Sequence, residues 1–278
     1  MTAQAEIAVI GGSGLYSLFS APVTEVKVDT PYGSPSGQVT VARVGKRSVA
    51  FLPRHGRDHR FPPHRIPYRA NMWALRKLGV RHIFAPCAVG GLRAALGPGT
   101  LVVPDQIVDR TVSRLGTFWD SGARHTSFAD PYCPVGRRTV LDVAAKMSAA
   151  ESTDRGISGA VDGGTMVVIE GPRFSTRAES QWYAAQGGSV INMTGMPEAI
   201  LARELGMCYT SIALVTDTDA GVEVGESVTH EEVMRVFAEN IERVRAVLLQ
   251  AVSELPLDHA CVDQTKVDVP PVEGTSTV

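Results

Sequence analysis

Short apolar segments alternate with segments of helical spacing along this 278-residue chain, and this alternation constrains the fold more than any other feature. Ile7–Ile10 is apolar and runs into glycines, and Cys208–Thr216 is the strongest such segment. Met72, Leu75 and Leu78 recur at the spacing of one helix face. Strands that alternate with helices build α/β folds. We therefore predict a single α/β domain.

The expected elements can be placed by residue range. Strands are expected at 7–10, 37–44, 48–52, 83–86, 100–103, 166–169, 189–191 and 208–216. Helices are expected at 68–78, 139–147, 175–185, 197–205 and 229–252, the last opening on a capping box of Thr229 and Glu232. Residues 255–278 lack periodicity. The domain is thus expected to span 1–254, followed by an extended or disordered tail over 255–278.

Composition and charge argue against several classes of protein. A net charge of -2 with 20% charged residues favours neither a nucleic-acid surface nor a polybasic membrane face. No apolar run is long enough to span a bilayer, and the N-terminus lacks the features of a signal peptide. The four cysteines show no paired spacing: Cys87, Cys133, Cys208 and Cys261. We expect reduced thiols in a cytoplasmic protein, without a disulfide framework or a metal site.

Two segments that follow expected strands suit an anion. Glycines at 11, 12 and 14 let the backbone approach a ligand, although a plain turn explains them equally well. Ser17 stands where a dinucleotide fingerprint needs glycine, which disfavours an NAD-binding oxidoreductase. Arg54, His55 and His59 form a basic cluster that fits phosphate better than a metal, with a solvated basic loop as the alternative.

Three more segments carry candidate chemistry. Cys87 follows a strand and is interpreted as a pocket thiol rather than a nucleophile, and Phe174 either stacks on a heterocycle or belongs to the core. Thr194 lies before a helix and either binds an anion or caps that helix. Asp217 and Asp219 end the strongest strand, where one carboxylate can protonate a leaving base, although an Asx turn is the simpler reading.

Five strings resemble, in this order, the methylthioadenosine phosphorylase branch of the trimeric purine nucleoside phosphorylase family: IGGSGLY, LPRHGRDH, IEGPRFSTRAES, INMTGMPEA and ALVTDTD. The resemblance extends from about residue 7 to residue 252. It implies a single α/β domain with a distorted, partly closed mixed sheet flanked by helices, and a homotrimer. It also implies phosphorolysis of 5'-methylthioadenosine to adenine and 5-methylthioribose 1-phosphate, with inorganic phosphate as co-substrate and no other cofactor.

The resemblance also implies roles for individual residues. The phosphate site falls on Ser13, Arg54, His55, Cys87, Ala88 and Thr194. The base pocket falls on Phe174, Ser175 and the expected catalytic residues Asp217 and Asp219, and the ribose contact on Met193. The pocket for the 5'-substituent falls on His125, His230, Val233 and Met234, and His125 is expected to reach a neighbouring subunit's site.

Two departures leave alternatives open. The methylthioadenosine branch usually has threonine at the position of Cys87 and an apolar residue at that of His230. A histidine at position 230 resembles enzymes that bind a 5'-hydroxyl, so a purine nucleoside phosphorylase acting on adenosine or 6-oxopurine nucleosides is the main alternative. Enzymes of the family that act on 6-oxopurines resemble this chain but carry asparagine in place of Asp217 and glutamate in place of Ser175. A nucleoside- or phosphate-sensing module without turnover is a further alternative.

Overall fold

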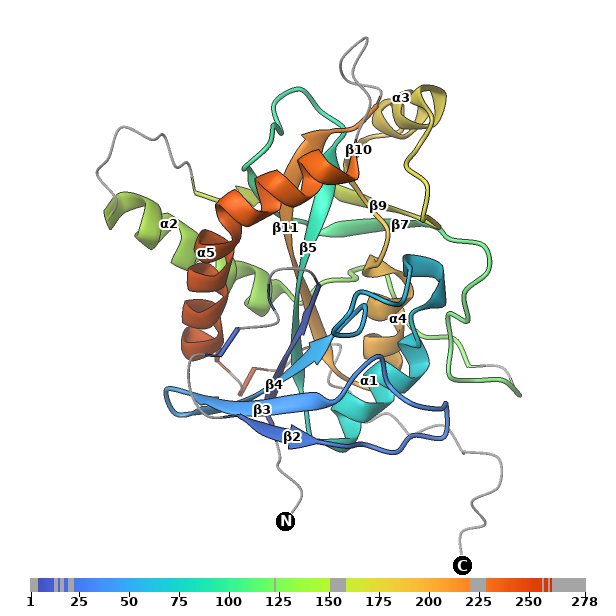
Figure 1. The fold of residues 1–278 in the computed structure, drawn as a ribbon, viewed down its shortest axis with the longest axis vertical. Coiled ribbons are helices and arrows are strands. Elements are labelled where there is room, and N and C mark those ends of the chain that lie inside the picture. The colour runs from blue at the N-terminus through green and yellow to red at the C-terminus, as the bar shows by residue number, and fades with distance from the viewer. Residues whose placement is uncertain are drawn as a thin grey trace, which may run out of the picture.

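The computed structural model describes residues 5–12, 15, 18–19, 23–122, 124–150, 159–220, 229–256, 258–259 and 261. Within these residues eleven strands form one mixed sheet (Figure 1). Its main path runs through β2 (Thr24–Val26), β3 (Val39–Val44), β4 (Arg47–Pro53), β1 (Ile7–Gly11), β5 (His82–Gly91), β10 (Gly188–Asn192), β9 (Thr165–Ile169) and β7 (Gln106–Arg110). Off this path, β11 (Cys208–Thr218) pairs with β5 and with β6 (Leu101–Val103), and β6 pairs with β8 (Val161–Asp162).

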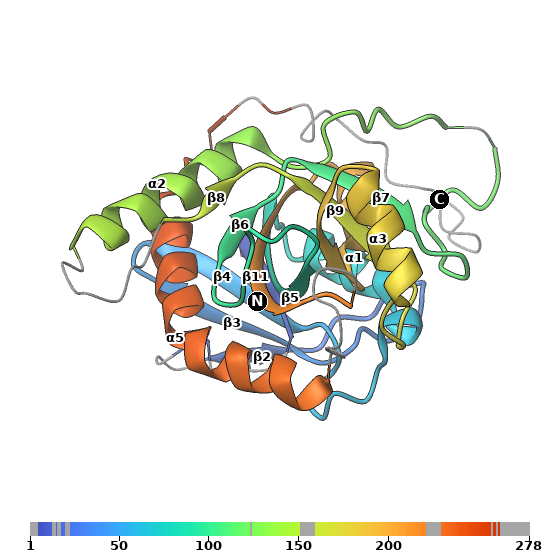
Figure 2. The same cartoon turned by 90° about the horizontal axis from the view of Figure 1, so that it is seen from above.

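The centre of the sheet is the parallel pair β5 and β11. Their register runs from Cys208 opposite His82 to Thr218 opposite Gly91. β5 also pairs in parallel with β1 near its start and antiparallel with β10 near its end. Because β5 contacts three strands, the sheet branches and curves around it instead of staying flat (Figure 2). The predicted mixed, distorted central sheet is confirmed.

Helices cover both faces of this sheet. α2 (Pro134–Ala150) and α5 (His230–Glu254) pack on each other and on β11, while α1 (Tyr68–Lys77) and α4 (Gly195–Glu204) pack together on the other side (Figure 1). Successive residues of β11, Ala213 and Leu214, belong to the two different hydrophobic cores between these layers. This alternation follows from the pleat of a strand, which sends neighbouring side chains to opposite faces.

The remaining helices are short and begin at clear signals. α3 (Arg177–Ala185) lies beside β10 and opens on a capping box of Thr176 and Glu179. A turn of 3-10 helix spans Pro63–Arg65. At α5 the Thr229 side chain accepts a hydrogen bond from the backbone N–H of Glu232, which is one of the two bonds of the predicted capping box. In the described part of the chain, no helix has the length and apolar character needed to cross a membrane.

The observed elements differ from expectation mainly at the edges and at strand ends. β5 extends to Gly91 because pairing with β11 and β10 holds residues 87–91 in the sheet, beyond the strand expected at 83–86. β2, β7 and β8 were not expected from sequence. β7 is largely exposed and polar, and it is held as a strand by its parallel pairing with β9.

Candidate active site

A cavity of about 400 Å³ opens where several strands end, and it brings together most of the predicted site residues. Among the predicted residues, those lining it are Arg54, His55, Cys87, Ala88, Phe174, Ser175, Met193, Thr194, Asp217, Asp219, Val233 and Met234. They come from β5, β11, α5 and the loops that follow β4, β9, β10 and β11. β4, β5 and β11 run in the same direction, so their carboxyl ends meet at one edge of the sheet, where α/β proteins bind ligands. β10 runs antiparallel to β5 and brings the loop that follows it against the same part of β5.

Arg54 forms the buried floor of one end of the cavity. Its Nε donates to Glu198 Oε1 at 2.6 Å and its Nη2 to Oε2 at 3.1 Å. The same guanidinium donates to the carbonyls of Pro86 and Ile10 at 3.1 and 3.0 Å. Arginine has five N–H donors. Among the described residues these contacts use four of them, so one N–H on Nη1 is left for a ligand. Arg54 is thus both a structural anchor and a point of positive charge.

His55 lies beside Arg54 and is uncharged at neutral pH. Burial lowers the pKa of His55 to about 4; the carbonyl of Phe61 opposes this effect and the charge of Arg54 adds to it. Nδ1 lies 2.8 Å from the Phe61 carbonyl oxygen and must donate its proton there. His59 stacks on the His55 ring at 4.2 Å. Within the described chain, these two histidines belong to no group of metal-ligand geometry.

The segment before α4 presents a hydroxyl to the same end. The Asn192 side-chain oxygen accepts from the backbone N–H groups of Thr194 and Gly195, both at 2.7 Å. Asn192 therefore supplies the hydrogen bonds that cap this turn, and the Thr194 side chain makes no capping bond. The simple capping role considered for Thr194 is wrong. Thr194 lines the cavity at the start of α4, a position that suits an anion, and its hydroxyl makes only a long 3.4 Å hydrogen bond to Asn192 Oδ1.

Asp217 and Asp219 occupy the opposite end of the cavity. The Thr216 hydroxyl donates to Asp217 Oδ2 at 2.8 Å, and the Ser180 hydroxyl of α3 donates to Asp219. The β5–β11 pairing slips between Val215 and Asp217, a β-bulge that leaves Thr216 without a partner residue on β5. A Cβ on Gly90, which pairs with Asp217, would lie 2.9 Å from Asp217 Oδ1, so only glycine leaves room for the carboxylate.

The environment of both carboxyl groups favours their neutral form. Burial raises the pKa of Asp217 from its ordinary 3.8 to about 6; the Thr216 hydrogen bond opposes this shift and the charge of Asp219 adds to it. Burial also raises the pKa of Asp219, against the hydrogen bond from Ser180. A carboxyl group with a pKa near neutrality can hold a proton and give it to a substrate.

Two neighbouring residues complete this end. Ser175 Oγ is buried and has no hydrogen-bond partner among the described residues, which marks it as a group that awaits a ligand. Phe174 is 36% exposed and lines the cavity, so it does not belong to the hydrophobic core.

Cys87 also lines the cavity, and burial raises the pKa of its thiol. A protonated thiol suits the pocket-lining role and not that of a nucleophile.

α5 supplies an apolar wall through Val233, Met234 and Phe237. Three of the predicted site residues are not found among the residues that line the cavity. Ser13 and the side chain of His230 lie outside the described residues. His125 is exposed on the loop before α2 and does not line the cavity of its own chain.

Sequence reasoning missed several residues that shape the site. Glu198 is fully buried, yet in the sequence an acidic residue in the first turn of a helix only suggests a favourable charge at that helix end. No sequence pattern distinguishes Asn192 from an ordinary residue at the end of a strand. Phe237 lies one helical turn after Val233, and this spacing on α5 is the signal that could have identified it.

The fold and the cavity together define a class of enzyme. A branched α/β sheet holds a buried arginine at one end of the cavity and neutralisable carboxyl groups at the other, an arrangement suited to group transfer between an anion and a nitrogen heterocycle. The chain belongs to the Phosphorylase superfamily, whose sequence model matches residues 6–253.

Similar proteins carry two related names. A purine nucleoside phosphorylase of Streptomyces coelicolor is 60% identical over 262 residues, covering 91% of this chain and 90% of that protein. An S-methyl-5'-thioadenosine phosphorylase of Mycolicibacterium smegmatis is 54% identical over 255 residues, covering 92% and 93%. A methylthioadenosine phosphorylase of Schistosoma mansoni, solved in complex with adenine, matches with a TM-score of 0.83 at 38% identity, covering 90% of this chain and 91% of that one.

Replacing Glu198 tests whether it holds Arg54 in place. We expect Glu198→Gln to lower the free energy of unfolding by about 3–5 kcal/mol, because it leaves a buried guanidinium without a counter-charge. Tyr209→Phe is the matched control, since it removes only the 2.8 Å hydrogen bond to Glu198 and should cost about 1–3 kcal/mol. Urea denaturation and the KM for phosphate would be measured for both. Equal stability losses would contradict the assignment.

The raised pKa of Asp217 predicts a pH-dependent stability difference. Below pH 3.8 the carboxyl group is protonated in both the folded and unfolded chain, and above about 6 it is ionised in both. Between these values only the unfolded chain loses the proton, so the free energy of unfolding of the wild type falls as pH rises. The stability of Asp217→Asn relative to the wild type should therefore grow by at most about 3 kcal/mol across this window.

Urea denaturation from pH 4.5 to 7.5 measures this difference. Asp58→Asn, at an exposed position, is the control. A difference between Asp217→Asn and the wild type that stays constant with pH would show that burial does not shift the Asp217 pKa.

Proposed function

We infer that the chain catalyses the phosphorolysis of 5'-methylthioadenosine to adenine and 5-methylthioribose 1-phosphate. The observation that carries this inference is that one cavity joins the Arg54 end, the Asp217 end and the apolar wall of α5. These three surfaces match the phosphate, the purine and the methylthio group of that reaction. The relatives named as methylthioadenosine phosphorylases support the same reaction.

The geometry assigns a role to each end. An oxygen of phosphate attacks C1' of the sugar while the bond from C1' to purine N9 breaks, and the electron pair stays on the purine. Phosphate is held by the remaining N–H of Arg54 and the hydroxyl of Thr194, so its charge also lies close to the cationic sugar. Asp217 gives its proton to purine N7, which prevents charge from building up on the leaving base.

Protonated Asp217 also selects the base. One carboxyl oxygen donates to N7 while the other accepts from the 6-amino group of adenine. A 6-oxo group would place an acceptor against that oxygen, which disfavours inosine and guanosine. Ser175 Oγ, which lacks a partner among the described residues, lies in the same wall and can serve as a further polar contact.

The α5 wall favours a methylthio group over a 5'-hydroxyl. Val233, Met234 and Phe237 offer no hydrogen-bond partner, so a hydroxyl placed against them would lose its bond to water. A purine nucleoside phosphorylase acting on adenosine or on 6-oxopurine nucleosides is the second candidate. The Streptomyces coelicolor relative with that name is the observation that favours it.

A kinetic comparison tests these proposals. Release of free base would be measured from methylthioadenosine, adenosine and inosine, with and without phosphate, in buffer without any added cofactor. We expect phosphate-dependent cleavage with the highest kcat/KM for methylthioadenosine. Ligand binding without base release would favour a sensing module, and the highest kcat/KM for inosine would favour the second candidate.

Asp217→Asn sharpens the same assay. Asparagine cannot protonate N7, and its amide N–H₂ can meet a 6-oxo group. We expect kcat/KM for methylthioadenosine to fall by about 10²–10⁴-fold, the typical contribution of a positioned acid, while inosine loses less. An unchanged ratio of the two substrates would show that Asp217 does not contact the base.

We further propose a cytoplasmic homotrimer. Val112 and Leu115 are 87% and 63% exposed, and apolar side chains of this kind suit burial against another copy of the chain. In such an assembly the exposed His125 is available to a neighbouring subunit's cavity. Sedimentation equilibrium would report the mass of the assembly, and a monomeric mass would contradict this proposal.

A further inference from the structure

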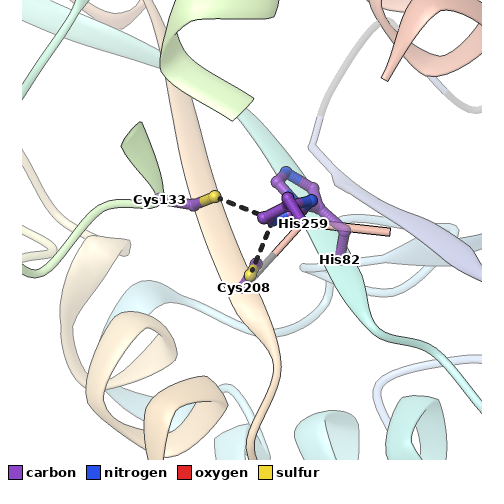
Figure 3. A group of neighbouring side chains, drawn as sticks. All are labelled: His82, Cys133, Cys208 and His259. Atoms are coloured by element: carbon purple, nitrogen blue, oxygen red, sulfur yellow. Dashed lines mark hydrogen bonds between the residues drawn. The ribbon is translucent and has the colours of Figure 1, made fainter. Parts of the chain in front are cut away.

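A second cluster of reactive side chains lies at the far end of the central strand pair. His82 is the first residue of β5 and Cys208 the first of β11, and the two are paired across the sheet. Cys133 comes just before α2 and His259 follows α5 (Figure 3). One ligand atom from each of the four lies within 4.8 Å of all the others. The cavity described above lies at the opposite ends of the same two strands.

The spacing of these atoms fits the edges of a coordination tetrahedron. Nε2 of His259 lies 3.5 Å from the sulfur of Cys133 and 3.5 Å from the sulfur of Cys208. With zinc–sulfur bonds of about 2.3 Å and zinc–nitrogen bonds of about 2.0 Å at tetrahedral angles, the sulfur–nitrogen edge is about 3.5 Å.

Hydrogen bonding alone does not account for both contacts. Nδ1 of His259 lies 2.6 Å from the Pro256 carbonyl oxygen and must carry the ring proton. In the neutral ring Nε2 then has a single lone pair, which can accept from only one thiol. A cation shared by this nitrogen and both sulfurs explains why the two distances are equal.

The second histidine is arranged in a similar way. His82 Nε2 bonds to the Thr210 hydroxyl at 3.1 Å, and Nδ1 is buried without a hydrogen-bond partner among the residues described. Histidines that bind metals usually engage their other nitrogen with an oxygen, which fixes the ring. The backbone N–H of Gly136 points at the Cys133 sulfur at 3.4 Å, a contact that stabilises a thiolate.

We propose that His82, Cys133, Cys208 and His259 form a structural zinc site that fastens the chain after α5 to the base of the central sheet. Two thiolates and two imidazoles are a donor set that zinc prefers, and four protein ligands leave no open position for catalysis. The two thiolates balance the charge of the ion, so the site can be buried as a neutral unit. The expectation of no metal site came from sequence spacing, which cannot reveal ligands from four separate segments.

Cys261 offers an internal comparison. Its sulfur lies 3.9 Å from that of Cys133, but it is outside the group of four. The proposal assigns it no ligand role, so Cys261→Ser is the matched control for Cys208→Ala. Both variants remove one thiol from the same neighbourhood.

Metal content of the full-length chain, purified under reducing conditions and supplied with zinc, tests the site. The wild type and Cys261→Ser should hold about one zinc per chain, whereas Cys208→Ala and His259→Ala should hold less than about a tenth. Cobalt added to metal-free wild type should give the visible absorption of a tetrahedral thiolate complex. Because His259 is remote from the cavity, His259→Ala should retain phosphate-dependent cleavage, which shows that it is folded.

A substitution next to a ligand, rather than of a ligand, tests the site through a partial loss of zinc affinity. Thr210→Val removes the oxygen bonded to His82 and should weaken zinc binding by about 10- to 100-fold without abolishing it. The proposal is overturned if wild type binds neither zinc nor cobalt, or if zinc is lost in Cys261→Ser and retained in Cys208→Ala. An intact mass two hydrogens below that of the reduced chain, with no metal, would instead identify a disulfide and also overturn it.

Discussion

The buried ion pair of Arg54 and Glu198 is the contact on which the cavity depends. The pair joins the end of β4 to α4, and the Arg54 guanidinium also donates to the carbonyls of Ile10 in β1 and Pro86 in the middle of β5. Tyr209 of β11 donates to the same carboxylate. Burial alone would lower the pKa of Arg54, but the charge and hydrogen bond of Glu198 outweigh it and raise that pKa. One fixed charge pair thus links four strands and a helix.

The site then separates charge along the cavity. Permanent positive charge stays at the Arg54 end, while burial raises the pKa of both carboxyl groups at the other end. In the proposed reaction, a sugar that becomes cationic between them is stabilised by phosphate on one side and loses its base toward an acid on the other. Asp219 is held by Ser180 of α3, so this helix contributes to the site without lining its centre.

Part of this site could be predicted from sequence because β4 and β11 run parallel to β5 and their carboxyl ends meet at one edge. Thr194 reaches the same place from β10, which runs antiparallel to β5. Arg54, Thr194 and Asp217 each follow or end an apolar strand, and the structure places all three in one cavity. Glu198 could not be predicted, since its role depends on a side chain 144 residues away. β7 was missed because pairing with β9, and not its own polar pattern, keeps it extended.

The bulge in β11 has a consequence for anyone who remodels this enzyme. Thr216 is an extra residue in the pairing with β5, and it decides which side chain of β11 faces the cavity beside Gly90. Deleting or inserting one residue upstream would present a neighbour of Asp217 instead. The carboxyl ends of β5 and β11 must therefore be exchanged together between homologous scaffolds if Asp217 is to keep its position beside Gly90.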